Sequence, residues 1–298
     1  MSSGNLAADR RFTYAQGLRQ EGDPAAAAEV IAQALELTPG WPEGHFALGE
    51  ALADAGRRDD AIDAYRTYLA LDAADSMGAG ARLHLLGAAE RPRTLSGAYV
   101  RRLFDEYADR FDQALVGRLQ YRAPQILRAA LGERTFNRAL DLGCGTGLVG
   151  EAIRDICTWL GGVDLSPAMT QAAARKAIYD HLETADMLAA LKTIDACDLM
   201  VAGDVLVYCG DLAPIFTAVR EKVLATGLFA FTLQRNDTED FVLGPEHRFS
   251  HSLAYVVRVA ADCGFIVQKI QNAVCRQEKG VDVPGLLAVL SPKPKSTL

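Results

Sequence analysis

A glycine-rich turn between an apolar strand and a helical stretch is the feature that most constrains this fold. The strand is predicted over residues 137–142, and the turn after it holds Gly143, Gly145 and Gly147. A helix is predicted over 148–157 from the spacing of its apolar side chains. Glycine lets the backbone of such a turn come close to a ligand, because it has no Cβ. The pattern therefore predicts an α/β domain that binds a ligand at this turn.

A second apolar strand, predicted over 159–163, ends in an acidic residue, Asp164. An acid at this point can accept hydrogen bonds from the hydroxyl groups of a ribose. Gly145, Gly147 and Gly150 also have the G-x-G-x-x-G spacing of dinucleotide-binding proteins. Together these features predict a nucleoside cofactor, and the glycines alone leave its class open.

Asp141 separates two classes of nucleoside cofactor. It lies at the end of the first strand, where a dinucleotide would place its pyrophosphate. Like charges about 4 Å apart repel by roughly 4 kcal/mol at an effective dielectric constant of about 20. S-adenosylmethionine carries no phosphate, and a nearby carboxylate would stabilise its ammonium group and its sulfonium centre. Asp141 therefore favours S-adenosylmethionine over NAD.

Several segments in order along the chain resemble one protein family. Asp141-Leu-Gly-Cys-Gly-Thr-Gly147 resembles motif I of the class I S-adenosylmethionine-dependent methyltransferases. Residues 162–166 resemble their ribose-binding segment, 184–188 their adenine-edge segment and 198–204 their fourth strand. The resemblance covers roughly residues 97–291 and implies a Rossmann-like domain that uses S-adenosylmethionine and releases S-adenosylhomocysteine. With the repeats described below, the chain resembles predicted methyltransferases that carry N-terminal tetratricopeptide repeats.

The resemblance implies a set of cofactor-binding residues. They are Asp141, Gly143, Cys144, Gly145, Gly147, Asp164, Leu165, Met169, Asp186, Met187, Gly203, Tyr107 and Phe111. Tyr107 and Phe111 belong to the first of two helices predicted between residues 98 and 132. In small-molecule methyltransferases such an aromatic helix often covers the cofactor, where a sulfonium gains about 0.5–2 kcal/mol over an aromatic face. Packing in a core is the alternative for these aromatic side chains.

The acceptor side is expected in the loops that follow the fourth and fifth strands. We expect Gly203 to allow close approach to the cofactor and Asp204 and Tyr208 to face the methyl group. Residues 241–252 are expected to form an inserted substrate lid. His251, within it, is a third candidate catalytic residue.

Two arginines and a tyrosine are expected to bind the substrate: Arg248, Tyr255 and Arg276. Either arginine could pair with an acidic acceptor. His247 and His251 are four residues apart, a spacing that can bind a metal on a helix. We expect no metal, because the spacing shows no third ligand.

Strands and helices alternate after motif I. Strands are predicted near 137–142, 159–163, 182–185, 197–202, 227–233, 265–271 and 285–291, and helices near 148–157, 167–178, 212–224 and 250–263. Such alternation predicts a seven-stranded, mostly parallel sheet with helices on both faces. Ligands bind at the carboxyl ends of strands in such sheets.

The N-terminal part repeats itself with a period of 34 residues between residues 8 and 75, so that Gly22 recurs as Gly56. This period is typical of tetratricopeptide helix pairs, and a plain four-helix bundle is the alternative. Residues 75–89 are expected to form a capping helix. The predicted domains are therefore an all-α repeat domain over 1–89, a linker over 90–96 and a methyltransferase domain over 97–298.

Charge and composition limit the partners. The net charge is −7, and residues 1–89 carry 7 arginines, no lysine and 13 acidic residues. The remaining part is nearly neutral and has no long basic run, so a nucleic-acid substrate is disfavoured. No apolar run approaches the roughly 20 residues of a membrane helix, and no signal peptide is evident. The six cysteines include no C-x-x-C pair, which favours free thiols in the cytoplasm.

Two functions are compatible with these patterns. The first is methyl transfer to oxygen, nitrogen or a carboxylate of a small molecule. The alternative is a protein methyltransferase whose acidic repeats recruit a partner protein, since repeat arrays offer concave binding surfaces. A scaffold protein that has lost catalysis is disfavoured by the intact motif I, and an NAD-dependent enzyme is disfavoured by Asp141.

Overall fold

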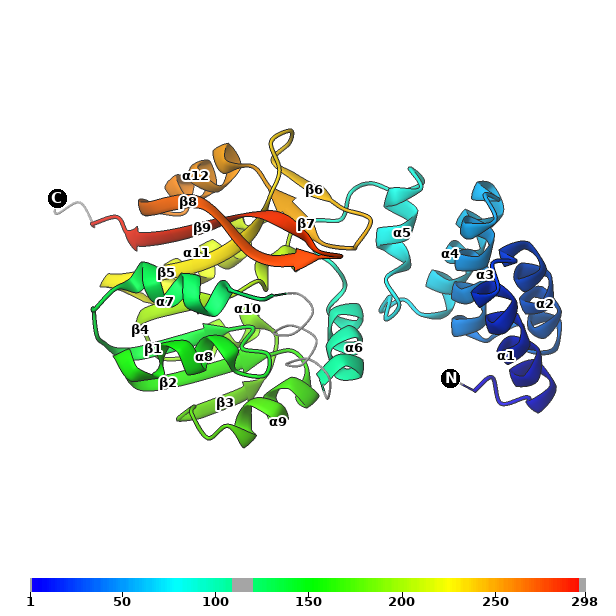
Figure 1. Cartoon of the computed structure of the whole chain (residues 1–298), viewed down its shortest axis with the longest axis horizontal. Coiled ribbons are helices and arrows are strands. Elements are labelled where there is room, and N and C mark those ends of the chain that lie inside the picture. Colours follow the sequence, from blue (N-terminus) through cyan, green and yellow to red (C-terminus); the bar gives the residue numbers. More distant parts are fainter. Residues whose placement is uncertain (1, 109–119, 295–298) are drawn as a thin grey trace. The chain divides into compact units, whose positions relative to one another are not determined.

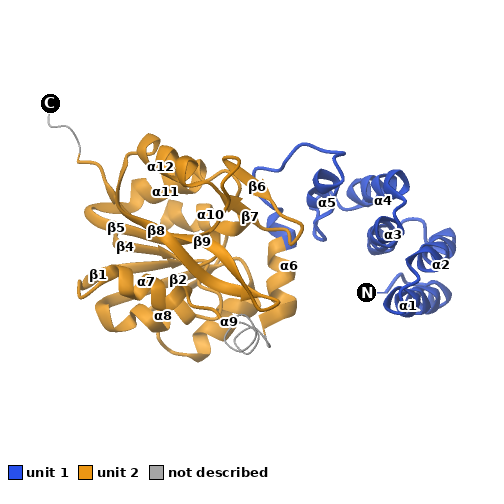
Figure 2. Ribbon diagram, turned by 45° about the horizontal axis from the view of Figure 1, so that its top comes forward, with its two compact units in different colours: residues 1–99 blue, residues 100–298 orange. Residues whose placement is uncertain are grey.

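The computed structural model describes residues 2–108 and 120–294. The chain divides into two compact units, residues 1–99 and 100–298 (Figures 1 and 2). The boundary between the units lies within helix α6 (Gly97–Tyr107). Each unit has a hydrophobic core of its own.

The first unit is entirely helical in its regular elements. Its helices are α1 (Leu6–Gln20), α2 (Pro24–Leu37), α3 (Pro42–Asp54), α4 (Arg58–Leu71) and α5 (Ala79–Leu85). The bounds of α2 recur 34 residues later as the bounds of α4, in agreement with the repeat in the sequence. A Cβ on Gly49 would lie 2.7 Å from the Tyr65 ring. Glycine at this position therefore lets α3 and α4 pack closely.

The second unit is built on one sheet. Its strands are β1 (Phe136–Leu142), β2 (Cys157–Asp164), β3 (His181–Thr184), β4 (Cys197–Ala202), β5 (Val223–Arg235), β6 (Phe241–Leu243), β7 (Phe249–His251), β8 (Phe265–Glu278) and β9 (Val281–Pro292). The strand order is β3-β2-β1-β4-β5-β7-β6, and β9 pairs with both β5 and β8. Strands β1 to β5 run parallel to their neighbours in this order, and β7 is parallel to β5 and antiparallel to β6, whereas β9 is antiparallel to β5.

Helices cover both faces of this sheet (Figure 1). They are α7 (Ala123–Leu131), α8 (Leu148–Ile153), α9 (Pro167–Arg175), α10 (Met187–Thr193), α11 (Ala213–Lys222) and α12 (Leu253–Asp262). Buried side chains of α7 and α8 share one core with the sheet, and those of α10, α11 and α12 share the other. The predicted Rossmann-like α/β architecture with a preceding helical domain is confirmed.

The sheet has two more strands than the seven predicted. Strands β6 and β7 form a short antiparallel pair, and β7 also pairs with the end of β5. They lie in the segment 241–252, so this segment extends the sheet, and its role as a substrate lid stays a prediction. Strands of three residues are too short to show an alternating pattern. Helix α10 was not predicted either, since it spans only 187–193.

Candidate functional site

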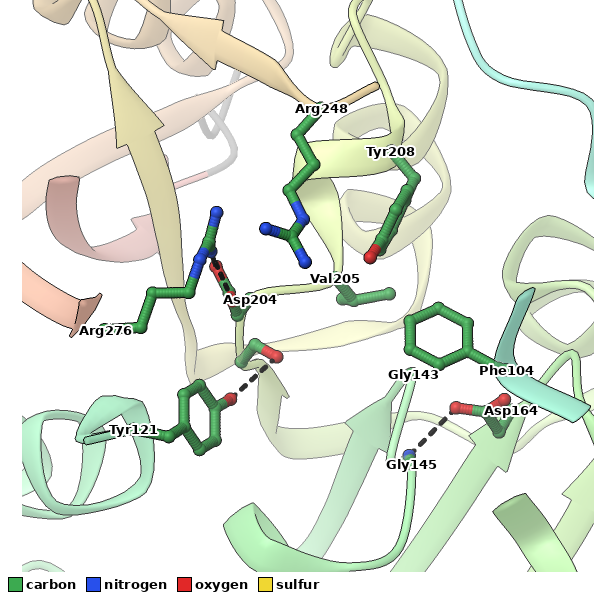
Figure 3. A pocket seen from close by; sticks show the side chains of 11 residues that line it. Phe104, Tyr121, Gly143, Gly145, Asp164, Asp204, Val205, Tyr208, Arg248 and Arg276 are labelled. Atoms are coloured by element: carbon green, nitrogen blue, oxygen red, sulfur yellow. Dashed lines mark hydrogen bonds and ion pairs between the residues drawn. The ribbon is translucent and has the colours of Figure 1, made fainter. Parts of the chain in front are cut away.

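A pocket lies where β1, β2 and β4 end, at the carboxyl edge of the parallel sheet (Figure 3). The residues that line it are Phe104, Tyr121, Gly143, Gly145, Asp164, Gly203, Asp204, Val205, Tyr208, Arg248 and Arg276. About 500 Å³ of space, part of it open to solvent, lies between its walls. One side of the pocket is the glycine turn with Asp164, and the other side carries the arginines.

The glycine turn after β1 forms one wall of the pocket. Its backbone conformation requires glycine at three positions. Gly143, Gly145 and Gly147 have φ angles of 67°, 52° and 93°, which L side chains rarely adopt. A Cβ on Gly143 would also lie 2.3 Å from the side chain of Val205. The amide of Cys144 donates to the Val163 carbonyl at 2.9 Å, which fixes the turn to β2.

Asp164 is the acidic side chain at the end of β2. Its Oδ2 accepts from the Gly145 amide at 2.8 Å and its Oδ1 from the Ser166 amide at 2.9 Å. Burial raises the pKa of Asp164, and the hydrogen bonds from these amides oppose the rise. A carboxylate has about four acceptor positions. The two amides therefore orient Asp164 while leaving acceptor capacity for hydroxyl groups of a ligand.

Asp141 lies beside this turn but is not among the residues that line the pocket. It is fully buried, and its Oδ2 accepts a hydrogen bond from the Tyr179 hydroxyl at 2.7 Å. Its Oδ1 has no hydrogen-bond partner among the described residues. Burial raises the pKa of Asp141 to about 7, and the bond from Tyr179 opposes this. The structure therefore places Asp141 next to the glycine turn but outside the pocket lining.

A buried ionic cluster forms the opposite side of the pocket. Nη1 of Arg276 lies 2.6 and 2.5 Å from the two carboxylate oxygens of Asp204. Arg276 also donates from Nε to Glu278 at 3.2 Å and from Nη2 to Gln234 at 3.3 Å. Arg248 lies just before β7 and forms an ion pair with Glu278. The cluster joins β5, β7, β8 and the loop after β4.

Asp204 is held in a strained conformation at this point. Its φ of +57° is rare for a residue other than glycine, and such strain costs on the order of 1–3 kcal/mol. Its amide donates to Thr232 Oγ1 at 2.9 Å, and the Tyr121 hydroxyl donates to the carbonyl of Gly203 at 3.2 Å. With Arg276 these contacts fix the carboxylate of Asp204 in the pocket wall.

Tyr208 and Phe104 close a third side. Their rings meet edge to face with centroids 5.4 Å apart. Tyr208 ends a short 3₁₀ turn (Leu206–Tyr208) after β4, whereas Phe104 lies on α6. The next residue on α6, Asp105, accepts a hydrogen bond from Ser166 Oγ at 2.6 Å and so connects α6 to the start of α9. The sequence predicted neither Phe104, Asp105 nor Tyr121 as a site residue.

The structure places His251 and Tyr255 away from the pocket lining. His251 is fully buried, its Nε2 lies 2.9 Å from the Cys209 carbonyl, and burial lowers its pKa to about 4. The Tyr255 hydroxyl accepts from the Leu212 amide at 2.9 Å. Both side chains hold the loop that follows β4. The expected catalytic role of His251 and the expected substrate contact of Tyr255 have no support in this arrangement.

The other predicted cofactor residues also lie outside the pocket lining. They are Cys144, Gly147, Leu165, Met169, Asp186, Met187 and Tyr107. Asp186 caps α10 by accepting from the amides of Leu188 and Ala189, and Met169 is fully buried in α9. Tyr107, at the end of α6, is 53% exposed. Phe111 lies outside the described residues.

The described part of the chain contains neither a cluster of metal-binding side chains nor a helix able to span a membrane. Among residues 2–108 and 120–294, no three histidine, cysteine or acidic side chains gather in a way that could hold a metal ion. Within the same ranges, no helix combines the length and the apolar character needed to cross a membrane.

The comparisons with known families follow the same division of the chain. Residues 140–229 match the family model for a methyltransferase domain, and residues 18–85 match that for a tetratricopeptide repeat. The chain carries a methyltransferase domain behind tetratricopeptide repeats. The repeat match favours tetratricopeptide units over the plain four-helix bundle. The glycine turn and the start of β5 both fall within the span of the methyltransferase match.

Curated relatives resemble part of the chain. A malonyl-[acyl-carrier protein] O-methyltransferase of Enterobacter lignolyticus is 31% identical over 120 residues, which are 40% of this chain and 48% of the relative. Nodulation protein S of Sinorhizobium fredii is 32% identical over 107 residues, 35% of this chain and 49% of the relative. The chain thus spans about half the length of the curated relatives it matches.

A solved structure shares the fold of the methyltransferase domain. The magnesium protoporphyrin IX methyltransferase of Synechocystis PCC 6803 with bound SAH has a TM-score of 0.52 and 15% identity. The match covers 65% of this chain and 99% of that protein. At this identity the likeness concerns the fold alone.

Proposed function

We propose that this chain transfers a methyl group from S-adenosylmethionine to a small-molecule acceptor. The observation that carries the proposal is the pocket itself, because it brings the glycine turn and Asp164 to face Asp204, Tyr208 and Arg248. The match of residues 140–229 to a methyltransferase domain supports this assignment. The pocket has one side for a nucleoside and another for an acceptor.

The residues on the nucleoside side suit S-adenosylmethionine. Asp164 would accept from the ribose hydroxyls, and the glycine turn at Gly143 and Gly145 would lie against the amino-acid part of the molecule. A carboxylate oxygen of Asp141 is buried close by without a hydrogen-bond partner among the described residues. This unsatisfied oxygen favours a cationic ligand near the turn over an anionic one. When bound, the cofactor supplies an activated methyl group.

The residues on the acceptor side would orient the acceptor. Asp204 is fixed by Arg276, so its carboxylate can accept a hydrogen bond from an acceptor hydroxyl or amine at a constant position. The protein's main task in such a transfer is alignment, which can supply roughly 7–11 kcal/mol in favourable cases. A base is needed only where the acceptor holds its proton at neutral pH. Tyr208 and Phe104 would exclude water from the reacting atoms.

One of the relatives is named for methyl transfer to a small acyl group, malonyl, that a carrier protein holds. A malonyl-[acyl-carrier protein] O-methyltransferase and nodulation protein S both match this chain over about half their lengths. We propose the domain bounds 1–89, 90–96 and 97–298 for this enzyme. We also propose a cytoplasmic location, because all six cysteines are free thiols, as is usual in a reducing compartment.

A labelled-donor experiment tests the proposed function against methylation of a protein. The full chain and residues 90–298 are each incubated with methyl-labelled S-adenosylmethionine and a desalted cell extract supplemented with its small-molecule fraction. We expect label in the small-molecule fraction from both proteins, since the pocket lies within residues 100–298. Label only in protein, and only with the full chain, would support the alternative in which the repeats recruit a partner.

A further inference from the structure

The guanidinium groups of the two pocket arginines, Arg276 and Arg248, differ in their exposure and in their hydrogen bonds to the protein. The Arg276 side chain is only 2% exposed, and each of its three guanidinium nitrogens donates to a protein acceptor. Its partners are Asp204, Glu278 and Gln234. Arg276 is therefore committed to holding the pocket wall and has little capacity to receive a ligand.

Arg248 is placed differently. Its side chain is 25% exposed and lines the pocket, where it contacts the hydroxyl of Tyr208 and the carboxylate of Glu278. An arginine has five N–H donors. Figure 3 shows the Arg248 guanidinium and the Tyr208 hydroxyl directed toward the same space. The guanidinium can thus present further donors to a molecule in the pocket while Tyr208 orients it.

The two guanidinium groups of the acceptor side share one counter-ion, Glu278. The acceptor side of the pocket wall carries two guanidinium groups, Arg248 and Arg276, but only one carboxylate, Asp204. Glu278 supplies the balancing charge from outside the lining residues, and it is shared between both arginines. Arg248 shares Glu278 with Arg276 and is the more exposed of the two guanidinium groups that line the pocket. A carboxylate that enters the pocket can therefore take the place of Glu278 as the partner of Arg248.

We propose that Arg248 receives a carboxylate of the acceptor, so that the substrate of this enzyme is a small organic acid. This inference rests on the proposed function, because it names the acceptor class of that same pocket. Arginine and carboxylate can form two parallel hydrogen bonds, which fixes the orientation of the acid as well as its position. Glu278 competes with the acid for the same guanidinium, and its charge makes the unliganded protein stable.

This competition gives the two partners opposite effects on acid binding. Arg248→Met removes the receiving group, and the loss of a charge-assisted pair weakens binding by about tenfold or more. Glu278→Gln removes the internal competitor while keeping the shape of the side chain, so the acid binds more tightly. A purely structural role of the pair predicts weaker binding in both variants. Arg258→Met serves as the matched control, because Arg258 pairs with Asp240 on the surface and does not line the pocket.

The experiment is a calorimetric titration of the full chain saturated with S-adenosylhomocysteine. The probes are straight-chain dicarboxylates from malonate to suberate, and the dimethyl esters of the same acids serve as neutral analogues. We expect at least one acid to bind while its diester does not. We also expect Arg248→Met to weaken this binding, Glu278→Gln to strengthen it and Arg258→Met to leave it unchanged.

Three results would overturn the inference: no acid of the series binds, acids bind equally to Arg248→Met, or Glu278→Gln weakens binding. The titration with S-adenosylhomocysteine that precedes each run separates this failure from failure of the proposed function. If wild-type protein does not bind S-adenosylhomocysteine, the proposed function itself is contradicted. A variant that no longer binds S-adenosylhomocysteine is misfolded. The acid titration of the other variant, Arg248→Met or Glu278→Gln, then tests the inference.

Discussion

Asp141 is the residue whose environment departs most from the sequence-based expectation. We predicted that it would act on the ligand as a fixed negative charge. Instead its carboxylate is fully buried, hydrogen-bonded to Tyr179 and raised in pKa to about 7. At neutral pH a large share of this group is therefore protonated in the protein without ligand. A positive charge that approaches favours the ionised form of the Asp141 carboxyl group. The ionised carboxylate then stabilises that positive charge.

This pKa predicts how stability depends on pH. The pKa of Asp141 is raised from 3.8 to about 7 in the folded state, so the folded protein holds the proton more tightly than the unfolded chain. The contribution is complete below about pH 4 and is lost as the pH rises to about 7. We expect Asp141→Asn, which cannot ionise, to gain about 2–4 kcal/mol relative to wild type between about pH 4 and about pH 8.

Urea denaturation measures this difference. Trp159 emission in a Trp41→Phe background reports on the methyltransferase unit, since these are the two tryptophans of the chain. The buried His251 titrates in the same range, but its contribution cancels in the comparison of wild type with Asp141→Asn. A difference in unfolding free energy that does not change with pH would show that Asp141 is not buried as described.

The site could be predicted where its residues are close in sequence. The glycine turn and Asp164 follow directly from strand ends, because parallel strands bring those ends to one edge. The partners of Asp204 could not be predicted, since Arg276 lies 72 residues further along and Tyr121 is 82 residues from Gly203. A local pattern contains no information on such pairs. The surroundings of His251 could not be predicted for the same reason, because only the fold shows that its Nε2 contacts backbone carbonyls.

Among the elements around the pocket, α6 contributes one wall through Phe104. None of its side chains is fully buried. Phe104 contacts Tyr208, and Asp105 accepts from Ser166 Oγ, the residue that caps α9. The helix was predicted from the spacing of its aromatic residues, but its link to α9 was not. Phe104 and Asp105 thus connect α6 to the loop after β4 and to the start of α9.

We predict that Asp105→Ala loosens α6 and speeds the release of S-adenosylhomocysteine. Loss of the hydrogen bond from Ser166 Oγ to the Asp105 carboxylate costs about 1 kcal/mol, which corresponds to roughly a fivefold change. Glu106→Ala is the matched control, because the Glu106 carboxylate pairs with Arg102 within the same helix. Hydrogen exchange of the α6 amides and stopped-flow release provide the readouts. Equal exchange in the two variants would contradict a role of Asp105 in holding the helix.

For the whole molecule, the two units divide the tasks. The repeat unit has a core of its own around Phe46, Tyr65 and Tyr68. Every residue that lines the pocket belongs to residues 100–298. The family matches likewise fall on either side of the boundary. Binding of the cofactor is therefore expected to depend on the second unit alone.

Calorimetry of the full chain tests this division. We expect two unfolding transitions. S-adenosylhomocysteine should stabilise only the unit that binds it, and the unfolding free energy of that unit should rise by about 2.7 kcal/mol at a ligand concentration of about 100 times Kd. Gly49→Ala places a Cβ 2.7 Å from the Tyr65 ring, and so it should lower only the other transition. A single transition, or a ligand effect on both, would show that the units are coupled.

The central claim is that the glycine turn and Asp164 bind an adenosyl-sulfur cofactor. Its most direct test is calorimetric titration of the full chain with S-adenosylhomocysteine and with NADH, repeated on Asp164→Ala. We predict one site for S-adenosylhomocysteine and no binding of NADH. In Asp164→Ala the binding of S-adenosylhomocysteine should weaken about tenfold or more, because the ribose hydroxyls lose a charged acceptor. Tight binding of NADH without any heat from S-adenosylhomocysteine would contradict it.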